Sequence, residues 1–221
     1  MNKHKIKAVL FDMDGVIIDS EPIHSKSIEK VLKKYGVKPI FLENGLIHPV
    51  GLSGDGVYVN ILQKHNAKIP IEIFIEERKI NFEKQLEKKL KPKKGFLSLV
   101  KLLKENNFKL SLSSNRRIDH VHLVVRNLDA TDYFNAIVGP SPTLKIKPAP
   151  DIYLETAKQL QVPPQDCVVI EDSEVGVIAG KSAKMKVIAV PNKYTKHHDF
   201  SKADKIVRNL GEITIPTLNA L

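Results

Sequence analysis

An apolar run that ends in two carboxylates constrains the fold of this chain more than any other stretch. The run from Val9 to Phe11 is too short for a core helix, and Asp12, Asp14 and Gly15 follow it at once. This pattern is typical of a buried parallel strand whose carboxyl end opens into a site. Because ligands of open α/β sheets bind beyond the carboxyl ends of the strands, the two aspartates are candidates for a nucleophile or a metal ligand. A plain Asp-x-Asp-Gly turn is the alternative, so the remaining parts of a site must be sought downstream.

Helical and strand patterns alternate from residue 95 onward. Strands are expected at 108–112, 136–138, 167–170, 187–190 and 205–207, and helices at 96–105, 118–128, 151–160 and 175–183. Strands that alternate with helices of this length imply βαβ units and a parallel sheet. Between the first strand and residue 92 the pattern is helical, at 21–35, after Ser53 and from 71 to about 90. The sequence therefore predicts an α/β protein with a helical block inserted after its first strand.

Polar side chains also end other predicted strands. Ser114 and Asn115 come just before a helix, where free backbone N–H groups suit an anion, although both are ordinary helix caps as well. Lys147 is held by the proline that follows it, and Glu171 and Asp172 end the strand at 167–170, where they could instead cap a helix. Carboxylate oxygens suit Mg²⁺, which binds through one or two carboxylates plus a substrate phosphate. Phosphoryl transfer needs this inventory of a cation, a lysine, fixed donors and an attacking group.

Four motifs in this order resemble those of the haloacid dehalogenase superfamily. They are Phe11-Asp12-Met13-Asp14-Gly15-Val16, Ser114-Asn115, Lys147-Pro148-Ala149-Pro150-Asp151 and Glu171-Asp172-Ser173. The resemblance extends from about residue 7 to residue 190 and is greatest to the beta-phosphoglucomutase-like and phosphoglycolate-phosphatase-like subgroup. It implies a Rossmann-like parallel sheet core made of residues 1–18 and 93–221, and an inserted all-helical cap domain made of residues 19–92.

The resemblance also implies a role for each candidate site residue. Asp12 would be the nucleophile that forms an aspartyl-phosphate. Asp14 would be the general acid for the leaving oxygen and then the base for water. Ser114 and Lys147 would bind the phosphoryl group, helped by the backbone of Asn115.

A magnesium site is implied at the same place. Asp12, the carbonyl group of Asp14, and Asp172 would hold Mg²⁺, with Glu171 close to the ion. Because dehalogenases of the superfamily work without the second aspartate and without the metal, the presence of Asp14 argues against dehalogenation. The expected activity is hydrolysis of small phosphate monoesters, such as sugar phosphates, through an aspartyl-phosphate.

Two alternatives stay open at this point. Mutases of the subgroup carry an arginine where this chain has Gly54, and that arginine grips the second phosphate of a sugar bisphosphate. Its absence favours a phosphatase over a beta-phosphoglucomutase-like sugar phosphomutase. A non-enzymatic phospho-accepting or metabolite-binding module is the second alternative, since receiver domains also place acids and a lysine at strand ends. A receiver needs only about half of this length and no inserted helical block.

Composition limits the partners and the compartment. The chain has 35 Lys and Arg against 25 Asp and Glu, a formal charge of +10, which suits small phosphorylated metabolites. Glu83 and Glu87 interrupt the basic residues between Arg78 and Lys94 and no aromatic residues alternate with them in a binding pattern, so we expect no nucleic-acid partner. No apolar run could span a bilayer, so no membrane partner is expected. The single cysteine, Cys167, indicates a buried thiol in the cytoplasm, and a monomer is the default expectation.

Overall fold

The computed structural model describes residues 5–50, 55–86 and 90–221. The chain divides into two units, one made of Met1–Asp19 with Lys91–Leu221 and the other of Ser20–Leu90. The insertion expected at residues 19–92 differs from this division by one residue at one crossing and by two at the other. Ser53 and Gly54, considered above as a helix cap and as the site of a missing arginine, lie outside the described residues.

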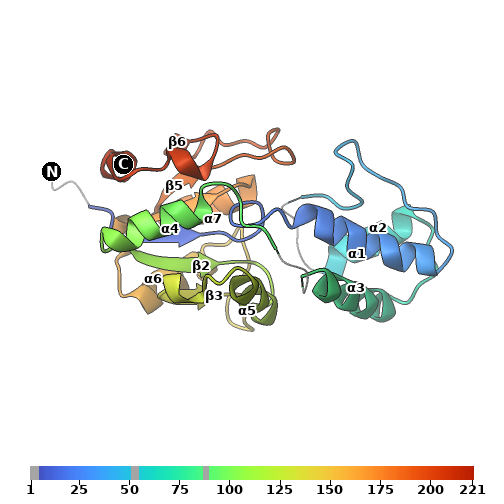
Figure 1. Cartoon of the computed structure of the whole chain (residues 1–221). Coiled ribbons are helices and arrows are strands. Elements are labelled where there is room, and N and C mark those ends of the chain that lie inside the picture. The colour runs from blue at the N-terminus through green and yellow to red at the C-terminus, as the bar shows by residue number, and fades with distance from the viewer. Residues whose placement is uncertain (1–4, 51–54, 87–89) are drawn as a thin grey trace. The chain divides into compact units, whose positions relative to one another are not determined.

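A six-stranded parallel sheet forms the first unit, in the order β3-β2-β1-β4-β5-β6 (Figure 1). The strands are β1 (Ala8–Phe11), β2 (Lys109–Ser113), β3 (Ala136–Val138), β4 (Cys167–Glu171), β5 (Lys186–Ala189) and β6 (Lys205–Ile206). All four residues of β1 are buried, as expected for a strand that lies inside a parallel sheet. The Rossmann-like α/β class is therefore confirmed, and each predicted strand lies within one residue of the observed one.

The helices of this unit lie between the strands in sequence. They are α4 (Phe96–Glu105), α5 (Ile118–Asn127), α6 (Asp151–Leu160) and α7 (Glu174–Ser182), followed by the short α8 (Ile215–Asn219). The sequence predicted the first four but not α8. That helix has only five residues, and its cap is the Thr214 side chain, which accepts a hydrogen bond from the Thr217 N–H. A helix of this length depends on contacts with the rest of the fold more than on its own propensity.

The side chains of β1 alternate between the two faces of the sheet. Phe11 meets Phe96 of α4 edge to face, with ring centroids 6.0 Å apart. Leu10 instead belongs to a buried cluster that includes Tyr153 of α6 and Val177 of α7. Helices thus cover both faces of the sheet, which leaves the carboxyl edge as the place for polar groups.

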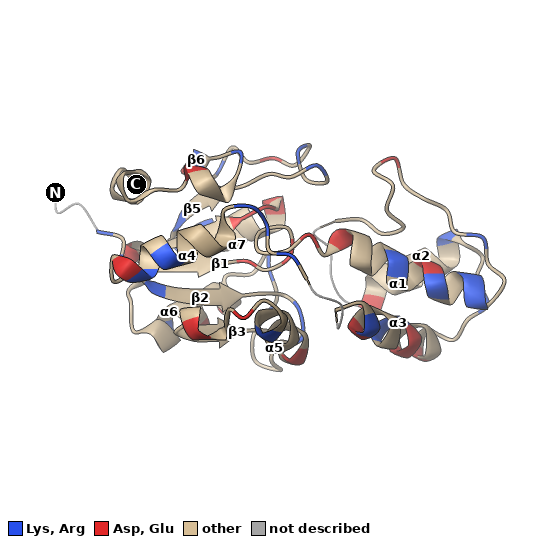
Figure 2. Cartoon of the chain, in the orientation of Figure 1, with Lys and Arg blue, Asp and Glu red and all other residues tan. Residues whose placement is uncertain are grey.

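The second unit consists of α1 (Glu21–Lys34), α2 (Asp55–Lys64) and α3 (Ile71–Leu86). Its core contains buried apolar residues from all three helices and from the loops between them: Ile28, Val31, Leu32, Ile47, Ile61, Leu62, Ile69 and Phe74. Both signs of charge occur on α3, as Figure 2 shows. In the part of the chain that the structure describes, none of the helices combines the length and apolarity needed to cross a membrane.

Candidate active site

Strand register brings the polar residues that follow β1, β2 and β4 to one edge of the sheet. Phe11 pairs with Leu112 of β2 and with Ile170 of β4. The next residues, Asp12, Ser113 and Glu171, therefore lie at the same level of the sheet. Figure 2 shows acidic residues directly after the arrowhead of β1.

Gly15 allows the chain to turn sharply after Asp14. Its φ of +80° lies in the left-handed region, which favours glycine. A Cβ atom at this position would lie 1.9 Å from Oδ2 of Asp172. The turn therefore brings the loop after β1 into close contact with the end of β4, and a larger residue at position 15 would separate them.

The ammonium group of Lys147 joins these strand ends. Its Nζ donates to Asp12 Oδ1 at 2.5 Å, to Glu171 Oε1 at 2.8 Å and to the carbonyl oxygen of Ser113 at 2.9 Å. The side chain is only 2% exposed, so these bonds replace water around a fully buried charge. Asn115 fixes the backbone of Lys147, because its Oδ1 accepts from the Lys147 N–H at 2.9 Å and its Nδ2 donates to the Lys147 carbonyl at 3.3 Å.

Glu171 is surrounded by hydrogen-bond donors. Oε1 accepts from the Tyr153 hydroxyl at 2.8 Å in addition to Lys147. Oε2 accepts from the backbone N–H groups of Asp172 and Ser173 and from the Ser173 hydroxyl. The Ser173 side chain also caps α7, so the carboxylate lies at the positive end of that helix. These donors explain how a carboxylate can be buried at this position.

The buried charges shift the pKa values of two groups. Burial raises the pKa of Asp12 to about 8, and the negative charges of Glu171 and Asp14 add to this although Lys147 opposes it. Burial alone would lower the pKa of Lys147, but Asp12 and Glu171 outweigh it and raise that pKa above its usual value. Lys147 bonds to Asp12 and Glu171, so the buried carboxylates of the site outnumber its buried ammonium.

A divalent cation fits this excess. Asp12, Glu171 and Asp172 are all buried and place ligand oxygens within 4.8 Å of one another. Asn192 orients the last of them, since its Nδ2 donates to Asp172 Oδ2 at 2.6 Å. Hard carboxylate oxygens are the ligands that Mg²⁺ prefers, and its charge would favour the ionised form of Asp12. The residues present thus suit the ion that the sequence implies.

The segment after β2 does not form a helix cap. The first residue of α5 is Ile118, and its cap position is Arg117, without a side-chain cap bond. Ser114 lies several residues earlier, and its Oγ instead accepts the N–H of Arg116 at 3.1 Å. The interpretation of Ser114 and Asn115 as N-caps is therefore wrong, and the Asn115 side chain bonds to the backbone of Lys147 instead.

Three contacts of this site were missed from the sequence. Arg116 donates from Nε to Asp14 Oδ2 at 2.6 Å, and Lys93 donates from Nζ to the Gly15 carbonyl. Asn192, which orients Asp172, follows β5 and could have been found by examining a fifth strand end. The sequence gives no comparable signal for Arg116 and Lys93. Their long side chains extend from loops, and the order of the strands does not predict where such side chains end.

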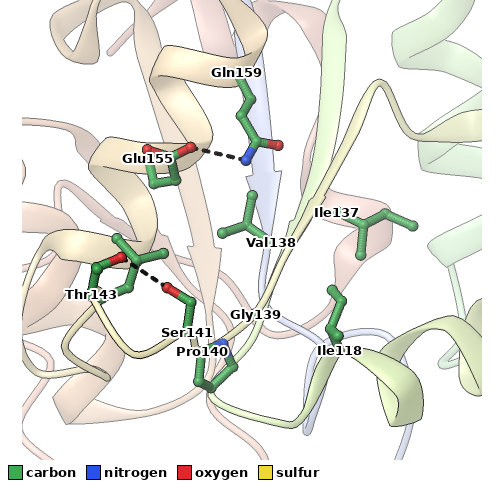
Figure 3. A pocket seen from close by; sticks show the side chains of 10 residues that line it. Ile118, Ile137, Val138, Gly139, Pro140, Ser141, Thr143, Glu155 and Gln159 are labelled. Atoms are coloured by element: carbon green, nitrogen blue, oxygen red, sulfur yellow. Dashed lines mark hydrogen bonds between the residues drawn. The ribbon is translucent and has the colours of Figure 1, made fainter.

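A pocket of about 400 Å³ lies elsewhere in the first unit, beside the edge strand β3 (Figure 3). Ile118, Val138 and Gly139 line it together with Glu155 and Gln159 of α6, which bond to each other at 3.0 Å. None of the carboxylates described above lines this pocket. The candidate site is thus defined by its charged groups and not by this pocket.

Comparison with known proteins gives matches over nearly the whole chain. The haloacid dehalogenase-like hydrolase family matches residues 9–190. A bifunctional riboflavin kinase/FMN phosphatase of Arabidopsis thaliana is 33% identical over 94% of this chain, which spans only 54% of that relative. Hexitol phosphatase B of Escherichia coli (strain K12) is 32% identical, with 97% of each protein covered.

Two further matches also cover nearly the whole chain. A beta-phosphoglucomutase of Bacillus subtilis (strain 168) is 31% identical, with 97% of this chain and 94% of that relative covered. The crystal structure of CbbY from Rhodobacter sphaeroides in complex with phosphate is 25% identical, with a TM-score of 0.81 over 94% of this chain and 96% of that one. Fold, strand-end site and family match agree, and the chain belongs to the haloacid dehalogenase-like hydrolase family.

Proposed function

We propose that this protein is a Mg²⁺-dependent phosphatase that hydrolyses small phosphate monoesters, with sugar phosphates as substrates by analogy with its relatives. The observation that carries the proposal is the bond between Lys147 and Asp12, at the edge where Glu171 and Asp172 also end their strand. An ammonium and a candidate nucleophile in contact are what phosphoryl transfer to a carboxylate requires. The family match favours this enzyme over a phospho-accepting receiver module.

The proposed reaction has two steps. In the first, a carboxylate oxygen of Asp12 attacks phosphorus, the bond from phosphorus to the ester oxygen breaks, and Asp14 gives a proton to that oxygen. In the second, water attacks the aspartyl-phosphate and gives a proton to Asp14, while the bond between Asp12 and phosphorus breaks and inorganic phosphate leaves. Ser114, the backbone of Asn115, and Lys147 would hold the phosphoryl oxygens in both steps.

The metal would lie among the carboxylates. Asp12, the carbonyl group of Asp14, and Asp172 would hold Mg²⁺, with Glu171 beside it. When bound, the ion neutralises charge on the phosphate oxygens and on the surrounding carboxylates. Because Glu171 already accepts from Lys147 and Tyr153, we propose that it acts on the site mainly by holding the lysine.

The helical unit would select the substrate. We assign this role to residues 19–92 as a cap domain, because the strand-end residues recognise only the phosphoryl group that all phosphate monoesters share. Small phosphorylated metabolites are the proposed partners, in a cytoplasmic monomer that binds neither nucleic acid nor membrane. The single cysteine, Cys167, is buried and cannot form a disulfide within this chain, which supports a reducing compartment.

A substrate screen tests the proposal. Purified protein with Mg²⁺ should release inorganic phosphate from some members of a panel of phosphorylated metabolites, and a chelator should stop this until Mg²⁺ is returned. Beta-glucose 1-phosphate with a trace of the bisphosphate separates the alternatives: inorganic phosphate indicates the phosphatase, and glucose 6-phosphate the mutase. No turnover on any substrate would contradict both and leave the binding module.

A further inference from the structure

Arg116 reaches Asp14 from a segment about one hundred residues further along the chain. Its Nε lies 2.6 Å from Asp14 Oδ2, a distance typical of a strong charge-assisted hydrogen bond. The two side chains are 19% and 15% exposed, so the contact lies where solvent can still reach it. The guanidinium group is therefore next to the carboxylate that would exchange a proton with the substrate.

The backbone that carries Arg116 is tied to the phosphate-binding segment. Its N–H donates to the hydroxyl oxygen of Ser114, and the intervening Asn115 is bonded twice to the backbone of Lys147. The base of the arginine side chain is thus fixed to the residues proposed to hold the phosphoryl group. A movement of the Arg116 backbone relative to the phosphate site would have to break these bonds.

The next residue, Arg117, provides a contrast. Its side chain is 65% exposed and pairs at 2.8 Å with Asp119, which is 50% exposed and lies in the first turn of α5. Exposed ion pairs of this kind contribute little to the stability of the fold. Two adjacent arginines therefore differ in burial and in the carboxylate that they bind: Arg116 contacts a candidate catalytic group, and Arg117 pairs with a residue of α5.

We propose that Arg116 is a positioning residue for Asp14, an inference that rests on the phosphatase function proposed above. Asp14 precedes the turn at Gly15, its side chain is partly exposed, and the bond from Arg116 restrains its orientation. With Oδ2 held by Nε, the carboxyl group loses rotational freedom, and a proton given to the leaving oxygen would come from Oδ1. General acid catalysis depends on such geometry, because the proton must lie within hydrogen-bond reach of the leaving oxygen.

If Arg116 positions Asp14, its loss should slow only those steps in which Asp14 transfers a proton. When Asp12 attacks phosphorus and the ester bond breaks, a poor leaving group such as an alkoxide must receive the proton from Asp14. A nitrophenolate leaves without a proton, because it is already stable as an anion. Arg116 itself keeps all its protons throughout the reaction.

A comparison of leaving groups tests this inference. We would measure kcat/KM for an alkyl phosphate and for p-nitrophenyl phosphate with Mg²⁺, in the wild type, Arg116→Gln, Asp14→Asn and the matched control Arg117→Gln. Arg116→Gln should lower the value for the alkyl phosphate about tenfold or more, with a change under about threefold for the nitrophenyl ester. Asp14→Asn should shift the ratio of the two values in the same direction, and Arg117→Gln should leave it unchanged.

The ratio of the two values does not depend on the fraction of folded enzyme, so a stability defect cannot imitate the expected result. Equal losses on both substrates, or no loss on either, would overturn the role of Arg116. If the wild type hydrolysed neither ester nor any metabolite in the screen, the phosphatase function itself would fail. If the wild type were active but the ratio stayed constant in Arg116→Gln, only the positioning role would fail.

Discussion

Each unit of the molecule buries a set of charged and polar side chains, and the two sets are held in different ways. The strand-end cluster consists of Asp12, Lys147, Glu171 and Asp172, and the helical cluster consists of Glu21, His24, His48 and Arg78. All eight residues are at most 8% exposed. In the strand-end cluster, Lys147 Nζ has three oxygen acceptors within 2.9 Å, and backbone N–H groups bind Glu171.

The helical cluster depends more on aromatic faces. The His24 ring stacks on Phe82 at 4.2 Å, and the guanidinium carbon of Arg78 lies 4.8 Å from the centre of the Tyr58 ring. His48 Nε2 lies 2.6 Å from Glu21 Oε2, but the other ring nitrogen of His48 has no hydrogen-bond partner among the described residues. Aromatic contacts tolerate more variation in geometry than hydrogen bonds do.

The difference indicates what each cluster is suited to. Backbone groups at the ends of strands and helices hold the strand-end charges in a fixed geometry, as catalysis of a defined reaction requires. The helical cluster combines charge with stacked rings and leaves a ring nitrogen of His48 without a hydrogen-bond partner among the described residues. At the same burial, it should therefore stabilise the fold less than the strand-end cluster does. Mutations in the two clusters should therefore have effects of different size and kind.

The largest expected effect is the loss of activity in Asp12→Asn. The amide cannot attack phosphorus as a carboxylate does, so turnover should fall by about 10⁴-fold or more in an assay of phosphate release. Circular dichroism should show an intact fold. Asp132→Asn, at an exposed position, is the control. Activity retained in Asp12→Asn would mean that the strand-end cluster does not perform covalent catalysis.

Lys147→Met tests how much the lysine of the strand-end cluster contributes to the stability of the fold. Removing the ammonium leaves Glu171 buried without its charged partner, which should lower the free energy of unfolding by about 3–5 kcal/mol. Urea unfolding would measure this, with the exposed Lys145→Met as the control. A loss no greater than that of the control would show that the strand-end cluster is not held together by its lysine.

The raised pKa of Asp12 predicts a pH dependence in the metal-free protein. Because the folded state keeps a proton up to about pH 8 that the unfolded chain loses near its ordinary value of 3.8, this carboxyl group makes unfolding easier as the pH rises between those values. The free energy of unfolding of the wild type should therefore fall relative to Asp12→Asn from pH 5 to pH 8, by up to about 1.4 kcal/mol per pH unit. Urea unfolding with a chelator present measures the difference. A constant difference over this range would contradict the raised pKa of Asp12.

Glu21→Gln should have the smallest effect. It weakens the bond to His48 but leaves a neutral acceptor in place, so the expected loss of stability is about 1–2 kcal/mol. Thermal or urea unfolding would detect it, and Glu76→Gln on the exposed side of α3 serves as the control. A loss as large as that of Lys147→Met would remove the distinction between the two clusters.

The sequence allowed most of the sheet and much of the site to be predicted, for a physical reason. Strands such as β4 are continuously apolar because both faces are buried, and their ends are marked by the change to polar residues such as Glu171. The side-chain contact between Arg116 and Asp14 has no such mark, because it depends on where two loops meet. The same holds for Glu21 and His48, which are 27 residues apart and separated by the rest of α1 and the irregular segment after it.

The position of β1 in the sheet has a consequence for synthesis on the ribosome. This strand is made first, yet it pairs with β2 and β4, and Glu171 at the end of β4 is translated long after it. The helical unit is translated in between and can bury its own core. The apolar residues of β1, in contrast, stay unpaired until β2 and β4 have been translated. The nascent chain thus carries an unpaired central strand through much of its translation, and this is the period in which aggregation or chaperone binding should compete with folding.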